Sequence, residues 1–175
     1  AGNGWGNNYE LIWLRFPRVV AALVAGFALG VSGATQQGLF RNPLADPYLL
    51  GSASGAGLGV ALGLVAAHST WAGLRALAPW SGELLAFLGA WLAVSLALWW
   101  SRGLTHTPRL LLAGVVVGVV LSAITSALML SVPQAWVSFQ AFMLGTTQAL
   151  DAPALLVLSA GLGVSAAMAW RAAPA

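Results

Sequence analysis

Five long stretches of this chain are apolar and contain no Asp, Glu, Arg or Lys, and they constrain the fold more than any other feature. An α-helix needs about 20 apolar residues to cross the roughly 30 Å hydrocarbon core of a bilayer. A chain in lipid must satisfy its own backbone hydrogen bonds, so such stretches are expected to be helices. They cover residues 19–40, 48–67, 84–101, 110–132 and 152–170. The sequence therefore predicts an all-α, polytopic transmembrane helix bundle with five spans.

Composition excludes several other classes of protein. The 175 residues are 59% hydrophobic and only 6% charged, whereas soluble domains are about 25% charged. All seven basic residues are Arg, and they are scattered rather than clustered. Nothing therefore resembles a phosphate-neutralising surface, and we expect a lipid bilayer and no nucleic acid as partner. The absence of Cys removes disulfides, thiolate catalysis and Cys-based metal sites.

Aromatic residues support the predicted span ends. Six tryptophans lie close to them, as the aromatic belts of membrane proteins do: Trp71, Trp80, Trp99, Trp100, Trp136 and Trp170. The link after the fourth span is too apolar for a free loop, and its aromatic residues recur at helical spacing. We expect a short interfacial helix at about residues 134–145. It fits either a helix lying at the membrane surface or an external docking shelf.

The distribution of the arginines favours one orientation of the chain across the membrane by a single residue. If the link after the first span is cytoplasmic, four arginines lie inside (Arg41, Arg102, Arg109 and Arg171) and three outside (Arg15, Arg18 and Arg75). Cytoplasmic loops are enriched in Arg and Lys. We therefore expect the N-terminus outside, residues 1–18 as an extracytoplasmic segment, residues 19–175 as the bundle, and a cytoplasmic C-terminus. The first residues do not resemble a secretory signal, so an outside start leads us to expect a fragment of a longer protein.

Glycines repeat at four-residue spacing in the second span. Gly51, Gly55, Gly59 and Gly63 form a small-xxx-small series, which lets helix backbones approach closely in lipid. We assign them to helix packing. The series fits ordinary bundle packing, and it also fits a helix that is surrounded by protein and moves.

A polar hinge separates the first two spans. It holds Arg41, Asn42, Pro43, Asp46 and Pro47 within seven positions. Proline has no N–H, and the residue before it avoids the helical region, so the first helix should stop here. Arg41 and Asp46 are spaced to form an ion pair across the turn. Residue types alone fit both a plain interfacial turn and part of a working pathway.

The sequence gives no sign of an enzyme. An intramembrane hydrolase needs a nucleophile with its base, paired aspartates, or a His-rich metal motif. None of the five spans contains Asp, Glu or His, and His68 and His106 are isolated at span ends. We therefore predict no catalytic, cofactor-binding or metal-binding residues.

Several linked motifs resemble one known family. The chain contains Arg15-Phe16-Pro17-Arg18, then Ser32-Gly33 followed by Gln37, then RNPLADP at residues 41–47 and LGSASGA at residues 50–56. RLLLAG at residues 109–114 and FMLG at residues 142–145 follow, the latter with Phe where the family has Trp. These motifs resemble FecCD-type permeases, the membrane subunits of ABC importers for iron-siderophores, haem and cobalamin. The resemblance covers nearly the whole chain.

The resemblance implies the type II permease fold of ABC importers, with the five spans as helices two to six of ten. It implies a homodimer in the bacterial inner membrane, a cytoplasmic ATPase dimer and an extracytoplasmic substrate-binding protein. Such a permease alternates between outward-open and inward-open states and performs no bond chemistry. ATP and Mg belong to the partner ATPase, and this chain itself needs no cofactor.

The resemblance also implies roles for particular residues. The cytoplasmic gate carries over to Asn42, Pro43 and Leu44, and more loosely to Thr105, His106 and Thr107. Outer arginines become candidates for docking the binding protein: Arg15, Arg18 and Arg75. For Arg15 and Arg18, anchoring at the membrane surface is the competing interpretation.

Two questions stay open at this point. Four polar residues of the first span are candidates for lining the pathway, although hydrogen bonding between helices explains them as well: Ser32, Thr35, Gln36 and Gln37. The cargo also stays open among haem, ferric siderophore and cobalamin, with iron compounds favoured because most members of the resembled family carry them. A structural or assembly membrane protein, or an inactive permease fragment, is the alternative function.

Overall fold

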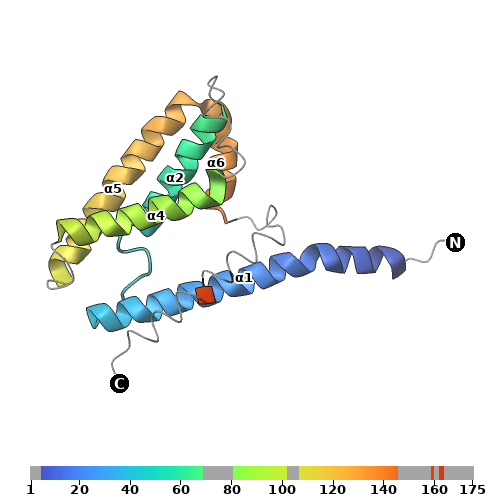
Figure 1. Ribbon diagram of the computed structural model, residues 1–175, viewed down its shortest axis with the longest axis horizontal. Helices are drawn as coiled ribbons and strands as arrows, with labels where there is room; N and C mark the ends of the chain where they lie inside the picture. Colours follow the sequence, from blue (N-terminus) through green and yellow to red (C-terminus); the bar gives the residue numbers. More distant parts are fainter. Residues whose placement is uncertain (1–4, 69–80, 102–106, 146–158, 160–161, 164–175) are drawn as a thin grey trace. The chain divides into compact units, whose positions relative to one another are not determined.

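The computed structural model describes residues 5–68, 81–101, 107–145, 159 and 162–163. The chain forms two compact units, Ala1–Leu39 with Thr146–Ala175, and Phe40–Gly145, and each is described by itself. Every described element is helical (Figure 1): α1 (Trp5–Phe40), α2 (Ser52–Ala67), α4 (Ser81–Trp100), α5 (Thr107–Ser131), the 3-10 turn η2 (Pro133–Ala135) and α6 (Trp136–Met143). The predicted all-α class is confirmed for this part of the chain.

The first unit is described mainly by α1. Its segment Arg15–Phe40 is long and apolar enough to cross a membrane, and apolar side chains such as Leu23 and Phe27 are exposed along it. The helix contains the expected span at residues 19–40 but begins earlier, at Trp5, and continues through Pro17. Residues 11–16 are largely apolar, and each residue added to an existing helix gains a hydrogen bond, so no break separates them from the span.

The second unit contains two further helices of spanning length. Gly82–Trp100 in α4 and Pro108–Ser131 in α5 are both apolar enough to cross a membrane, close to the expected residues 84–101 and 110–132. The helix α2 is shorter than the expected 48–67, because residues 48–51 form turns and the helix starts at Ser52. Residues 152–170, the fifth expected span, lie outside the described residues apart from 159 and 162–163. The apolar helices confirm a membrane helix bundle.

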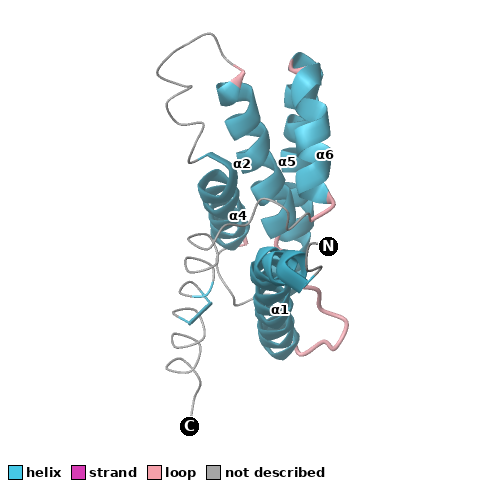
Figure 2. Ribbon diagram, turned by 90° about the vertical axis from the view of Figure 1, so that its right-hand side faces the viewer, coloured by secondary structure: helices cyan, strands magenta, loops and turns pink. Residues whose placement is uncertain are grey.

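Within this unit α2 contacts α4, α5 and α6, and Figure 2 shows it between α4 on one side and α5 and α6 on the other. Its contact with α4 depends on glycine. A Cβ added to Gly55 would overlap the carbonyl oxygen of Gly89 and lie 2.6 Å from the Cβ of Ala93. A Cβ on Gly59 would overlap the carbonyl of Leu85. The two backbones therefore approach as closely as small-residue interfaces in membranes allow.

The segment after α5 packs against α2 as well. The turn η2 and the helix α6 occupy most of residues 134–145, where the sequence predicted a short helix. Buried Ala135 packs with Ala61 of α2 and Met129 of α5. The helix is followed by Gly145 at φ 72°, a left-handed conformation that glycine adopts without strain. This segment is thus attached to α2 and α5 by apolar contacts.

Candidate functional site

The hinge between α1 and α2 consists of two successive turns with the same design. In the first, the backbone N–H of Ala45 donates to the carbonyl of Asn42 at 3.1 Å, and the N–H of Leu44 donates to Asn42 Oδ1 at 2.9 Å. Each turn starts with Asn or Asp followed by proline, which presets the φ of the second turn position. The side-chain oxygen then fixes the third residue, as in an Asx turn.

The second turn repeats these bonds four residues later. The N–H of Leu49 donates to the carbonyl of Asp46 at 3.1 Å, and the N–H of Tyr48 donates to Asp46 Oδ1 at 2.7 Å. Within the described hinge no ion pair joins Arg41 to Asp46, so the pairing suggested by their spacing is wrong. The carboxylate is used to build the turn.

Apolar contacts hold the hinge against α5. Phe40, Ala45 and Leu50 are buried in one cluster with Leu110 of α5. The entry into the hinge is through Arg41 at φ 48°, an uncommon left-handed conformation for a residue other than glycine. A chain fixed at both ends and within both turns is pre-organised rather than free to sample many conformations.

The third residue of each turn has an exposed side chain. Leu44 is 86% exposed and Tyr48 is 49% exposed, whereas Ala45, directly after Leu44, is buried. An apolar side chain exposed at the tip of a rigid, polar turn is suited to contact another apolar surface. Asn42, Pro43 and Leu44 are all exposed; Leu44 supplies the apolar side chain, and Asn42 Oδ1 accepts a hydrogen bond from its backbone N–H.

The side chains of the second gate group lie outside the part of the chain that the structure describes. Thr105 and His106 lie outside the described residues. Thr107 is the first residue of α5, and its side chain is also outside the described part. Their assignment stays a prediction.

The four candidates for lining a pathway do not share one face of α1. Ser32, Thr35 and Gln36 are three and four residues apart and lie on one side of the helix, whereas Gln37 is turned well away from Ser32. The hydroxyl of Thr35 donates to the carbonyl of Val31 at 2.7 Å, so it satisfies its own helix. Arg15 and Arg18 are exposed on the same helix three residues apart, and Arg75 lies outside the described residues.

A polar contact beside the hinge was missed by the sequence analysis. The hydroxyl of Ser122 in α5 donates to that of Ser54 in α2 at 3.1 Å. A cleft of about 380 Å³ lies next to this pair and is lined by Asp46, Tyr48, Leu49, Gly51, Ser54, Gly114, Val115, Gly118, Val119 and Ser122. Glycine forms the floor of this cleft at residue 114. A larger residue does not fit there, because a Cβ on Gly114 would overlap the carbonyl of Leu49. The serines that stand among the glycines of the second and fourth spans were the feature of the sequence that could have predicted this contact.

The described residues give no site for a metal ion. No group of three or more His, Asp or Glu side chains converges within them, and the sequence has no Cys. What the candidate site offers instead is a rigid turn pair beside a glycine-floored cleft.

Comparison with known proteins decides the family. The model of the FecCD transport family matches residues 4–175 of this chain. The chain belongs to the FecCD transport family. The match includes the hinge, all the described helices and the predicted fifth span, so the motif resemblance is confirmed. Membership also accounts for the three spanning helices, because a transport family of this kind works within a membrane.

Curated relatives of this chain carry the name vitamin B12 import system permease protein BtuC. Those of Salmonella paratyphi A, Klebsiella pneumoniae and Escherichia coli are 45%, 46% and 44% identical over 114 residues. That region is 65% of this chain and 33% of each relative, so the match spans about a third of their length. No solved structure gives a significant match.

Proposed function

We propose that this chain forms part of the membrane-spanning permease subunit of an ATP-driven importer. The family match over residues 4–175 is the observation that carries the proposal. The cargo is a metal chelate of the iron-siderophore, haem or cobalamin type. Cobalamin ranks first, because the relatives that are 44–46% identical are named as vitamin B12 import permeases. Transport across the bacterial inner membrane proceeds by alternating access.

The partners follow from the same proposal. Two copies of the permease form the pathway, a cytoplasmic ATPase dimer binds and hydrolyses ATP with Mg, and an extracytoplasmic binding protein delivers the cargo. The permease is not the catalytic subunit. In the proposed orientation the start of this chain is outside and its end is cytoplasmic, which assigns Arg15, Arg18 and Arg75 to the docking face.

The hinge is proposed as the cytoplasmic gate, with two distinct jobs for its residues. Leu44 closes the pathway as an exposed apolar tip, and Asn42 with Pro43 keeps that tip in position through the turn bonds described above. The alternative, a hinge without a gating function, would use the same turns and would leave leakage unchanged when the Leu44 side chain is shortened.

The proposal is tested by ATP hydrolysis in the assembled complex. The full-length protein that contains this sequence is reconstituted with its ATPase, and the binding protein is added empty or loaded with cobalamin, a ferric siderophore or haem. We expect one loaded form to stimulate hydrolysis above the empty form. If no loaded form stimulates it while the complex is intact, the protein is a structural or assembly protein instead.

A further inference from the structure

One row of residues on α5 lies against the hinge and the first turn of α2. Its members stand four residues apart and therefore form a single ridge of the helix: Leu110, Gly114, Gly118 and Ser122. They contact successive parts of the chain between Phe40 and Ser54. The ridge extends over about 18 Å at 1.5 Å per residue, so the hinge is in contact with α5 for most of its length.

The glycines of this ridge allow backbone to lie against backbone. A Cβ on Gly114 would overlap the carbonyl oxygen of Leu49 and lie 2.9 Å from the Cα of Leu50. A Cβ on Gly51 would lie 3.2 Å from the carbonyl oxygen of Gly114. Backbone atoms cannot move aside by changing a rotamer, and closely packed interiors transmit a displacement rather than absorb it. A shift of α5 at Gly114 therefore displaces the hinge as well.

The two ends of this contact are held by side chains. Leu110 is only 1% exposed within the cluster that buries the hinge, and the hydroxyl of Ser122 donates to that of Ser54 at 3.1 Å. The two compact units of the chain divide between Leu39 and Phe40, so the whole hinge is in the same unit as α5. Packing thus ties the hinge to a helix that is distant in the sequence.

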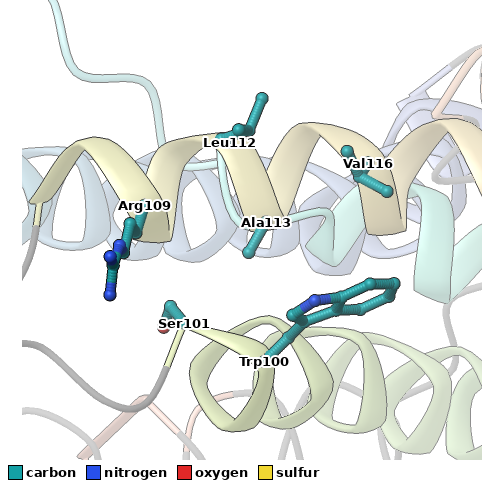
Figure 3. Close-up of a pocket in the computed structure, with 6 residues that line it drawn as sticks. All are labelled: Trp100, Ser101, Arg109, Leu112, Ala113 and Val116. Carbon is teal, nitrogen blue, oxygen red and sulfur yellow. The ribbon is translucent and has the colours of Figure 1, made fainter.

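The opposite side of α5 is packed less closely at this level. A second cleft, with a volume of about 530 Å³, lies between the end of α4 and the start of α5. Figure 3 shows the residues that line it, which are Trp100, Ser101, Arg109, Leu112, Ala113 and Val116. The start of α5 is therefore in backbone contact with the hinge on one side and bordered by a cleft on the other.

The second proposed gate group is attached to the same helix. Thr107 is the first residue of α5 and follows Thr105 and His106 directly in the chain. The first gate group, residues 42–44, is part of the hinge that lies on α5. Two groups that are far apart in the sequence thus belong to elements joined by the ridge.

We infer that the hinge and α5 move as one rigid body during transport, with Gly114 as the positioning residue, so that the two gate groups open and close together. The inference rests on the proposed function and adds to it how one motion controls both groups. Motion of α5 then displaces the Leu44 side chain while both hinge turns stay intact. A hinge that moved by itself would have to separate from Gly114 in every cycle.

A disulfide formed by Ser54→Cys and Ser122→Cys tests whether the two elements separate. The serine hydroxyl oxygens are 3.1 Å apart, and a disulfide joins sulfur atoms about 2.0 Å apart. The double variant is made in the full-length protein without other cysteines and is reconstituted with its ATPase and binding protein. Labelled cobalamin, ferric siderophore and haem are tested separately. We expect the oxidised and the reduced protein to accumulate cargo equally, because the bond joins parts of one body.

Accumulation that is lost on oxidation and restored by dithiothreitol would overturn the inference, because the two elements would then have to separate during transport. A disulfide that does not form under oxidation would also overturn it. The same full-length protein without the two substitutions is treated with the same oxidant as a control. If this control accumulates none of the three cargoes even before oxidation, the proposed function itself has failed.

Gly114→Ala tests the positioning function without introduced cysteines. Its methyl group should push the hinge away from α5. We expect leakage without ATP to rise about fivefold, which corresponds to about 1 kcal/mol, the lower limit for an overpacked contact. Gly118→Ala is the matched control on the same ridge and should leak less, because its Cβ would lie 3.5 Å from Ser54 Oγ, an ordinary contact.

Gly59→Ala separates positioning from a general loss of stability. Its Cβ also overlaps a backbone carbonyl, but in the contact of α2 with α4, so it should lower thermal stability without raising leakage to the level of Gly114→Ala. Equal leakage in these two variants would overturn the inference, as would a Gly114→Ala variant that assembles and does not leak.

Discussion

Asn42 Oδ1 accepts a hydrogen bond from the backbone N–H of Leu44 at 2.9 Å. This contact links the polar residue and the apolar residue that we propose for the gate. It gives them different functions, since the amide oxygen is engaged within its own turn while the leucine side chain is exposed. Asp46 and Tyr48 repeat the relationship four residues later and provide an internal reference for experiments.

Replacing Asn42 tests its positioning function. Asn42→Ala removes a hydrogen bond whose net contribution is about 1 kcal/mol, and the displaced turn should become about fivefold more populated. We expect leakage of cargo without ATP to rise by a similar factor in proteoliposomes. Asn42→Asp keeps the accepting oxygen and should leak far less than Asn42→Ala; equal leakage in both would contradict the assignment.

Replacing Leu44 tests the apolar tip. Leu44→Ala should leave thermal stability within about 0.5 kcal/mol, because the side chain is largely exposed. Leakage without ATP should nevertheless increase. Tyr48→Ala is the matched control, since Tyr48 has the same place in the second turn. A leak that appears equally in both variants would assign the effect to the turns in general rather than to Leu44.

Adding a methyl group to the α2–α4 interface should separate the helices. Gly59→Ala would place its Cβ against the carbonyl of Leu85, a backbone atom that cannot rotate away. We expect a loss of about 1–3 kcal/mol, as for other overpacked contacts, measured by thermal unfolding in detergent. Gly82→Ala in α4 is the control because its Cβ meets nothing within 4 Å; equal losses would contradict the close contact.

The serine pair between α2 and α5 should show measurable coupling. Ser54→Ala, Ser122→Ala and the double variant form a cycle around the 3.1 Å hydrogen bond. Bonds between membrane helices average about 0.6 kcal/mol in such cycles, and we expect a coupling energy of that size. Additive effects on unfolding would show that the two hydroxyls act independently.

Continuous apolarity predicted α4 and α5 well, because a helix in lipid must run across the whole hydrocarbon core. The conformational limits of proline and of the residue before it predicted that Asn42-Pro43 would end the first helix, which stops at Phe40. The start of α2 was misplaced because residues 48–50 are as apolar as the helix that follows. Only the turn bonds of Asp46 and the left-handed Gly51 reveal that the helix begins at Ser52.

The two clefts could not be predicted in the same way. Both depend on how α5 crosses its neighbours, and helices that are apolar on every side give no periodic signal of which face is buried. Arg109 looked like a loop residue, although its spacing to Leu112 and Val116 was visible in the sequence. The repeat of Asn-Pro and Asp-Pro at four residues was equally visible, but its meaning depends on hydrogen bonds that only coordinates show.

The central claim is that the protein containing this chain is the permease of an ATP-driven importer. The most direct measurement is accumulation of labelled cobalamin in proteoliposomes that contain the full-length protein, its ATPase and its binding protein. The account predicts accumulation that needs hydrolysable ATP. It also predicts that Leu44→Ala increases leakage and abolishes accumulation. An intact complex that accumulates neither cobalamin, ferric siderophore nor haem in the presence of ATP would contradict it.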